Sequence, residues 1–521
     1  MKSNYNYKHA FVVFVVGIFA ITLIPQTIIG GEKILRVGYA SIKGDWDPKY
    51  GGGSALQSMA HQITENLIEP DALTLQPKGQ LAESWTTSPN GLVWVFNLKK
   101  GVKFQDGTPF NADAVKWNFE RILDKKPKPA ARRYLYDKIT EMEVLDDHTL
   151  KVVLSQPVGP FLWYLMHRSV AMQSPTQYKK LGPDRYRDQI VGTGPFMIKK
   201  IVPGSHIETV AFKDYWGGTP KIGGITFFEI ADATARLQAV EAGDLDIALD
   251  IPYPDIPRIE KDPKIKLQKS LPTKLTQLIF NVSTQPALKD RRVRQALAYA
   301  IDRESIVKNI FFGKARLADS AVAKGIGGYQ PIKNYSYDLG KAKKLMAEAG
   351  YSKGFDFDFV IVATNPEQTM QKVFLQAIQS YWAELGVNIK IQVRNRMFQT
   401  QMRNPDFKHT WHGWAVGISP ATVDTGYSLK MMHYGPNAPP KVYNVGYYNN
   451  PALDKAIDDQ ELEADPVKRK KILFDALKIC MEDVPAIYLW AAQQHHAVRS
   501  NVMGAHFPMY EQIKLRNVSF K

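Results

Sequence analysis

Two strand–helix–strand units, separated by about 130 residues, constrain the fold of this chain more than any other feature. In the first unit, β-like segments at 225–230 and 246–251 flank a short helix. In the second unit, apolar residues alternate along 355–363, a helix follows, and 387–393 returns as a strand. Strands that alternate with helices build parallel sheets, so the sequence predicts a separate α/β core in each half of the chain.

The region 74–190 departs from this pattern. Apolar residues alternate over 92–104, and turn-forming residues lie at 89–91 and 106–107, as in a β-hairpin. A helix that begins at Asn111 follows. We therefore expect a subdomain inserted into the first half of the chain.

The composition is that of a folded protein with more than one domain. The chain has 521 residues, of which 45% are hydrophobic, so it can bury a large core in two or three domains. Its formal net charge of +16 favours anionic ligands or surfaces. However, its longest basic cluster, 468–471, lies on a predicted helix, where a solvated face is the simpler interpretation. Because no aromatic-and-basic motif is present, we expect no nucleic-acid partner.

The N-terminus has the pattern of a signal peptide. Lys2 and Lys8 precede the apolar run 10–24, which is short for a membrane span. We expect residues 1–31 to be removed, although large side chains near the cleavage site leave an uncleaved anchor as the alternative. No cysteine follows the run, so we do not expect a lipoprotein.

The sequence lacks the short motifs of common enzymes. It has neither the glycine-rich loop of nucleotide hydrolases nor the H-E-x-x-H pattern of zinc proteases. Ser54, in GGGSAL, lacks the second glycine of a nucleophile elbow. The single cysteine, Cys480, lies in line with apolar residues of a predicted helix, so we expect it in the core. We expect neither an enzyme nor a cofactor.

A metal site is a more serious alternative. Several histidines that fold together are able to bind a transition metal, and the candidates are His409, His412, His433, His495 and His496. No cysteine and no closely spaced carboxylate joins them. Ordinary surface or loop histidines are the simpler interpretation, so we expect no direct metal site.

Four long segments carry a family resemblance. The first is LAESWTTSPNGLVWVFNLKKGVKFQDGTPFNADAVKWNFERIL at 81–123, and the others are 191–248, 280–307 and 447–490. Together they resemble the family 5 solute-binding proteins of ABC transporters, of the peptide and nickel type, over about 33–510. The resemblance implies an α/β, two-lobed periplasmic binding protein fold (type II, cluster C) with an extra subdomain in lobe I.

The resemblance also implies how the lobes map onto the sequence. Lobe I is expected at 32–277, with the inserted subdomain at about 58–190. Lobe II is expected at 278–491, and 492–521 returns to lobe I. A ligand bound between two lobes stabilises their closed arrangement, which a membrane partner is able to recognise.

The function implied by the resemblance is ligand delivery. Such a protein is the extracytoplasmic component of an ABC importer. It captures its ligand and delivers it to permease subunits, while a separate chain hydrolyses ATP. We expect a monomer in the periplasm. Presentation of a ligand to a receptor, or a chaperone role, stays open as a different class of function.

Most residues that carry the resemblance are expected to form the scaffold and not the site. Asp290, Arg294 and Asp302 have the positions of helix caps and helix-surface pairs. The segment WHGWAVGISPATVDTG at 411–426 is more informative about the ligand. Its two tryptophans, Trp411 and Trp414, are candidates for a pocket wall, and a position in the core is the alternative.

The resemblance makes Gly417 informative about the kind of ligand that the protein binds. In peptide-binding relatives, an aspartate commonly follows this tryptophan after three positions and holds the α-amino group of the ligand. Here the third residue after Trp414 is Gly417, so the amine anchor is missing unless Asp424 takes its place from a shifted loop. A buried ammonium group needs such a partner. We therefore expect a ligand without a free amino terminus.

Further candidates for the ligand site lie elsewhere in the sequence. Tyr39 and Trp46, after the first strand, face the tryptophans in our interpretation, and Arg394 or Arg396 is placed to hold an anionic group. Our first choice of ligand is a neutral or anionic organic compound, such as an oligosaccharide, an opine or a modified peptide. An ordinary peptide bound through Asp424 is the second choice, and a chelated metal assisted by His409 or His412 is the third.

Overall fold

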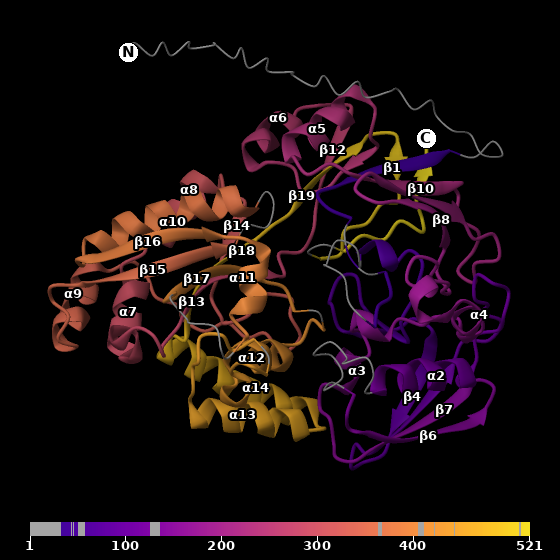
Figure 1. Cartoon of the computed structure of the whole chain (residues 1–521), viewed down its shortest axis with the longest axis horizontal. Coiled ribbons are helices and arrows are strands. Elements are labelled where there is room, and N and C mark those ends of the chain that lie inside the picture. Colours follow the sequence, from indigo (N-terminus) through magenta and orange to yellow (C-terminus); the bar gives the residue numbers. More distant parts are fainter. Residues whose placement is uncertain are drawn as a thin grey trace, which may run out of the picture.

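The computed structural model describes residues 33–521 apart from 43, 45, 50–57, 125–135, 363–366, 405–410, 421, 442 and 510–511. Within these residues the chain forms two main β-sheets, each with its own helices, and a smaller antiparallel sheet (Figure 1). The expected signal peptide, 1–31, lies outside the described residues. Among the described residues, no helix has the length and apolar character needed to cross a membrane.

The first main sheet has seven strands around a parallel centre. β1 (Ile34–Tyr39) lies between β10 (Gly224–Glu229) and β11 (Ile247–Ala248) and runs parallel to both. α5 (Ala233–Ala242) connects β10 to β11, which confirms the first strand–helix–strand unit. Antiparallel strands complete both sides of the sheet: β8 (Phe196–Val202), β9 (His206–Ala211), β12 (Ile265–Lys269) and β19 (His495–Arg499).

The second main sheet has six strands, and its parallel strands form one side of the sheet. β15 (Phe355–Val362) pairs in parallel with β16 (Val387–Arg394) on one side and with β17 (Gly413–Ile418) on the other. α10 (Glu367–Ala383) connects β15 to β16, so the second strand–helix–strand unit is also confirmed. The sheet continues through antiparallel strands, namely β13 (Lys274–Phe280), β18 (Ala486–Ala492) and β14 (Ala315–Leu317).

Helices cover both faces of the second sheet because its strands are apolar on both faces. Phe359 and Ile361 of β15 join one buried cluster, and Val360 and Val362 join the other. The helices of the first cluster are α7 (Arg291–Tyr299), α8 (Arg303–Ile310), α9 (Leu339–Glu348) and α10. Those of the second are α11 (Arg396–Gln401), α12 (Thr425–His433), α13 (Pro451–Leu462) and α14 (Pro466–Asp483), which buries Cys480.

The inserted region is built on a four-stranded antiparallel sheet with the order β4–β5–β7–β6. Its strands are β4 (Ala82–Thr87), β5 (Val93–Leu98), β6 (Ile139–Asp146) and β7 (Thr149–Leu154). α2 (Ala112–Leu123) packs against β6 and β7, and Asn111 caps it by accepting from the N–H of Ala114 at 3.0 Å. Smaller elements surround this sheet: β2 (Ile68–Pro70), β3 (Pro77–Gly79), α3 (Phe161–Tyr164) and α4 (Pro175–Tyr186).

Two segments connect the main sheets, and they are hydrogen-bonded to each other. Residues 270–273 lead from β12 to β13, and 493–494 lead from β18 to β19. The N–H of Ser270 donates to the carbonyl oxygen of Gln494 at 3.2 Å, and Nε2 of Gln493 donates to that of Ser270 at 3.3 Å. The expected lobe boundary after residue 277 falls inside β13, whose ladders with β17 and β18 place the whole strand in the second sheet.

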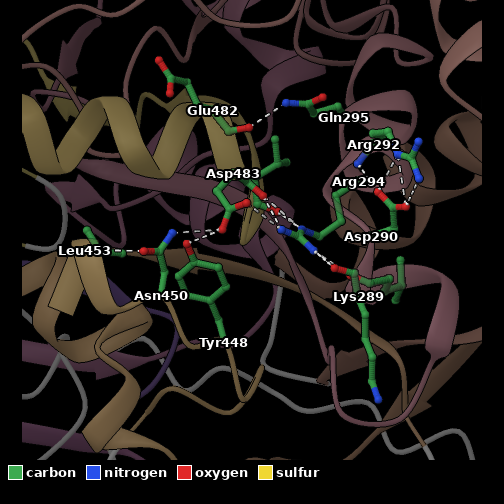
Figure 2. A network of polar contacts seen from close by, with 12 residues as sticks. Lys289, Asp290, Arg292, Arg294, Gln295, Tyr448, Asn450, Leu453, Glu482 and Asp483 are labelled. Carbon is green, nitrogen blue, oxygen red and sulfur yellow. Dashed lines mark hydrogen bonds and ion pairs between the residues drawn. The ribbon is translucent and has the colours of Figure 1, made fainter. Parts of the chain in front are cut away.

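The helix caps that we expected are present, but Arg294 is not on the surface. Asp290 accepts from the N–H of Arg292 at 2.8 Å, and Asp302 accepts from that of Ser305 at 2.9 Å. Arg294 has only 4% of its surface exposed. Its expected role as a helix-surface partner is corrected because the end of α14 folds over this face of α7, as Figure 2 shows.

The Arg294 guanidinium connects four backbone carbonyl groups. It donates to the carbonyl oxygens of Leu288 and Lys289 at 2.8 and 2.9 Å, next to the start of α7. It also donates to those of Asp483 and Val484 at 2.6 and 3.0 Å, where α14 ends. Burial lowers the pKa of Arg294, so the carbonyl groups and the Asp483 carboxylate, 3.1 Å away, compensate the desolvation of a charged group.

We predict that Arg294→Lys destabilises the protein by about 3 kcal/mol, because one ammonium group cannot reach carbonyl groups that a planar guanidinium connects. The measurement is the free energy of unfolding from urea titration. Arg292→Lys is the matched control: Arg292 is on the same helix with a half-exposed side chain, and we expect a change below about 0.5 kcal/mol. Equal effects of the two substitutions would contradict the role of Arg294.

Candidate functional site

The carboxyl ends of the parallel strands meet at the connection between the two sheets. In the second sheet, Lys274 pairs with Ala492 and Leu275 pairs with Ile418. Both crossing segments therefore meet this sheet at the edge where β17 ends. In the first sheet, the start of β19 lies beyond the end of β11, because Ala248 pairs with Ala497. Parallel α/β sheets bind ligands outside the carboxyl ends of their strands. The candidate site is therefore the region between these two edges.

A buried arginine fixes the edge of the first sheet. Arg236 of α5 is fully buried and donates to the carbonyl oxygens of Ile230 and Ala231 at 2.7 and 3.0 Å. It donates in the same way to Leu249 and Asp250, both at 3.0 Å. The ends of β10 and β11 are thereby held together. Sequence reasoning missed this residue, although an arginine one position before the apolar Leu237 of a short helix was a signal for it.

Tyr39 lies at this edge, Trp46 follows in the next loop, and both are buried. Tyr39 is the last residue of β1, and its ring meets the Phe227 ring edge-on at 5.8 Å. Trp46 lies in the following loop, where the carboxylate of Asp47 is ion-paired with Arg121 of α2. The loop is thus anchored to the inserted subdomain, while contact of Tyr39 or Trp46 with a ligand stays a prediction.

Trp411 and Trp414 lie on the face of the second sheet that carries α11–α14. They are 1% and 3% exposed, in one cluster with Leu275 and Ile279 of β13. Neither indole N–H has a hydrogen-bond partner among the described residues, although a buried N–H usually has one. Their role as a pocket wall stays a prediction, and the unsatisfied N–H groups are the feature that a polar ligand or water would complete.

A small cavity lies on the same face of the sheet. It has a volume of about 20 Å³, room for about one water molecule. Its walls come from the start of β13, the end of β17, the second half of α12 and the segment 321–326. Most of the lining is apolar, and the polar groups come from Thr273, Gln277, Ser428 and His433.

The side chain of Lys274 occupies the space beside Gly417. A Cβ atom placed on Gly417 would lie 2.4 Å from Cε of Lys274 and 3.2 Å from Cδ and Cγ. The ammonium nitrogen is one bond beyond Cε. The resemblance implies a carboxylate at this position in peptide-binding relatives. In this chain the position has no side chain, and the cationic side chain of Lys274 lies across it. Sequence reasoning missed Lys274 because it comes from another strand.

Asp424 is fully buried and has a structural role. Its Oδ1 accepts from the N–H of Tyr427 at 2.9 Å, which caps α12, and from a guanidinium nitrogen of Arg469 at 2.9 Å. Oδ2 has no hydrogen-bond partner among the described residues. An amine anchor at Asp424 would compete with Arg469 for the same carboxylate.

Arg394 ends β16 and is exposed, which suits a side chain at the carboxyl edge of the sheet. It donates to the side-chain oxygen of Gln392, and its guanidinium carbon lies 5.9 Å from the centre of the Phe398 ring. Arg396 begins α11, and its side chain is not among those that the structure describes.

The histidines are dispersed and mostly buried. His409 lies outside the described residues, and Nδ1 of His412 accepts from the N–H of Asp358 at 3.0 Å. Nε2 of His433 lies 2.9 Å from the hydroxyl oxygen of Tyr488. Burial lowers the pKa of His433 to about 3 and that of His495 to about 4. In the part of the chain that the structure describes, no three metal-binding side chains come together.

Two α/β sheets, connected by paired segments and facing each other with their carboxyl edges, define a two-lobed binding protein. The model of the family described as bacterial extracellular solute-binding proteins, family 5, middle part, matches residues 76–436. The chain belongs to this family. It is accordingly the solute-binding component of an ABC importer, since proteins of the family bind a ligand and work with ABC permeases.

Individual relatives cover almost the whole chain. The glutathione-binding protein GsiB of Shigella flexneri is 31% identical over 466 residues, which are 88% of this chain and 89% of GsiB. The structure of AgaA from A. tumefaciens R10 in complex with agropinic acid has a TM-score of 0.79 at 27% identity and covers 94% of this chain and 99% of AgaA. HbpA2 of Haemophilus parasuis has a TM-score of 0.80 at 25% identity, covering 94% and 100%.

We predict that stability falls with acidification in a way that depends on His433. The folded protein holds this ring neutral, with a pKa of about 3, whereas an unfolded chain protonates it below its ordinary value of 6.5. Its stabilising effect is therefore complete above pH 6.5 and is lost as the pH falls. Between pH 6.5 and pH 5 the loss is about 2 kcal/mol.

The measurement is urea unfolding at pH 7, 6 and 5, with His433→Gln as the comparison. The variant keeps a polar group near Tyr488 but has no proton to bind, so its free energy of unfolding is expected to fall less steeply. Parallel pH profiles for the two proteins would show that His433 is not a buried neutral ring.

Proposed function

We propose that this protein captures a small organic anion without a free amino terminus between its two lobes. The observation that carries the proposal is Lys274, whose side chain crosses the bare Cα of Gly417 at the carboxyl edge of the second sheet. Arg394 adds a second, exposed cation at the end of β16, which β15 separates from β17. A carboxylate between the lobes is stabilised by such charges, whereas an ammonium group is repelled.

Two relatives support an acidic ligand. GsiB is named for glutathione, and AgaA was solved with agropinic acid; both compounds carry carboxyl groups, but glutathione also carries a free α-amino group, so agropinic acid is the closer match to the proposal. An opine or a modified peptide therefore fits this chain better than a neutral oligosaccharide. In this proposal Trp414 forms the apolar wall, since Trp411 precedes the amino end of β17 and lies farther from Gly417. Tyr39 and Trp46 close the site from the other lobe.

We propose, further, that the protein works in the periplasm as a monomer. The pattern of residues 1–31 supports export through a cleaved signal peptide, and the lack of a cysteine after the apolar run supports a protein without a lipid anchor. The ligand would then pass to the permease of the transporter.

The first test is isothermal titration of the purified mature protein with glutathione, agropinic acid, an oligosaccharide, a dipeptide and nickel with histidine. We expect agropinic acid to bind and glutathione, which has a free ammonium group, to bind less tightly. Lys274→Gln is expected to weaken binding of agropinic acid at least tenfold, about 1.4 kcal/mol, because a charge-assisted hydrogen bond is lost. Lys264→Gln, at an exposed lysine before β12, is the control and leaves affinity unchanged. Tight binding of the dipeptide that does not depend on Lys274 would overturn the proposal.

A second test separates charge from crowding at Gly417. A side chain there displaces only the flexible end of Lys274, so Gly417→Asp and Gly417→Asn are both expected to fold. The aspartate pairs with Lys274 and removes its charge from the site, so we expect it to weaken binding of the acid at least tenfold more than the asparagine does. If both variants bind the acid equally, Lys274 does not provide the charge that recognises it.

A further inference from the structure

The inserted subdomain touches the second lobe far from the crossing segments. Figure 1 shows α3 of the subdomain beside the group formed by α12, α13 and α14. The N–H of Gly159 donates to the carbonyl oxygen of Glu461 at 2.7 Å, and the hydroxyl of Tyr164 donates to Oε1 of the same residue at 2.6 Å. We call this contact, between residues 158–164 and residues 460–469, the subdomain contact.

Glu461 is held in place from its own lobe. The ammonium nitrogen of Lys430, in α12, lies 3.3 Å from Oε2 of Glu461, whereas Tyr164 donates to Oε1. The Glu461 carboxylate is therefore positioned to accept from Tyr164, and its hydrogen bond to Tyr164 is charge-assisted.

Trp163 covers a buried ion pair of the second lobe. The guanidinium carbon of Arg469 lies 5.4 Å from the centre of the Trp163 ring, in the geometry of a cation–π contact. The ion pair of Arg469 with Asp424 has a length of 2.9 Å and side chains that are 5% and 0% exposed. Separation of the lobes at this point takes Trp163 away from the ion pair of Arg469 with Asp424 and lets water reach that pair.

The two sides approach each other so closely that only glycine fits at position 159. A Cβ atom on Gly159 would lie 2.2 Å from the carbonyl oxygen of Glu463 and 2.8 Å from that of Gln460. Both atoms are backbone and cannot move aside without the second lobe moving. The φ angle of Gly159 lies outside the left-handed region, so alanine is compatible with the local backbone. Glycine is needed at this position because the lobes approach each other closely, and not because the backbone turns there.

We propose that the inserted subdomain is a latch that stabilises the closed arrangement of the lobes through the subdomain contact. Rotation about the crossing segments moves distant parts of the lobes most, so opening breaks the contact of Gly159, Trp163 and Tyr164 with the second lobe. This inference extends the proposed function, because ligand affinity falls in proportion to the closed fraction when the closed state is the binding-competent one.

The test is Gly159→Ala in the full mature protein, examined first without ligand. The added methyl group keeps the lobes apart, so we expect a larger radius of gyration by small-angle X-ray scattering than for the wild type. Gly340→Ala in α9 is the matched control, since the nearest atom to its Cβ is a side-chain oxygen 3.6 Å away. An unchanged radius for Gly159→Ala would overturn the latch.

A second pair of variants, each lacking only a hydroxyl group, tests the latch if Gly159→Ala does not fold. Tyr164→Phe removes the hydroxyl that reaches Glu461, while Tyr434→Phe removes one that reaches Asp458 at 2.8 Å within the second lobe. We expect only Tyr164→Phe to raise the dissociation constant for agropinic acid, at least threefold, because it lowers the closed fraction. Equal dissociation constants for the two variants would contradict the latch. Scattering without ligand tests the latch even if the ligand proposed above is wrong, and wild-type binding tests that ligand even if the latch is wrong.

Discussion

A buried guanidinium that binds backbone carbonyl groups holds each lobe together at one point: Arg236 in the first lobe and Arg294 in the second. Strand and helix ends present carbonyl groups without regular partners, and burying them unpaired costs about 1–3 kcal/mol each. Arg236 satisfies the ends of β10 and β11, which carry the candidate site, and Arg294 joins the start of α7 to the end of α14. These contacts fix strand and helix ends within each lobe, which a binding protein needs if closing is to position its site.

The crossing segments are the connection about which the proposed closing takes place. Ser270 and Gln493 are hydrogen-bonded across the two strands, so these strands form a short paired connection and not two independent linkers. Such a connection favours rotation over sliding. The carboxyl edges lie beside this axis and the subdomain contact lies far from it, so ligand contacts and subdomain contacts are made in the same movement.

The sequence contained the elements of the fold but not their long-range pairing. Hydrophobic alternation predicted both strand–helix–strand units, and the caps at Asn111, Asp290 and Asp302 follow local rules that a sequence displays. Arg294 was misassigned because its carbonyl partners at Asp483 and Val484 are about 190 residues away. In the same way, Gly417 was recognised as unusual, but only the register of β13 against β17 brings Lys274 to it.

The strength of the subdomain contact is limited by the need to admit a ligand. One neutral hydrogen bond contributes about 1 kcal/mol, a charge-assisted one about 2 kcal/mol and a cation–π contact about 1 kcal/mol. Ordering the side chains of Tyr164 and Glu461 offsets part of this sum. The remainder is smaller than the 5.5 kcal/mol or so that converts a mostly open population into a mostly closed one. The contact therefore biases the lobes toward closure without locking them empty, and the ligand supplies the rest of the free energy.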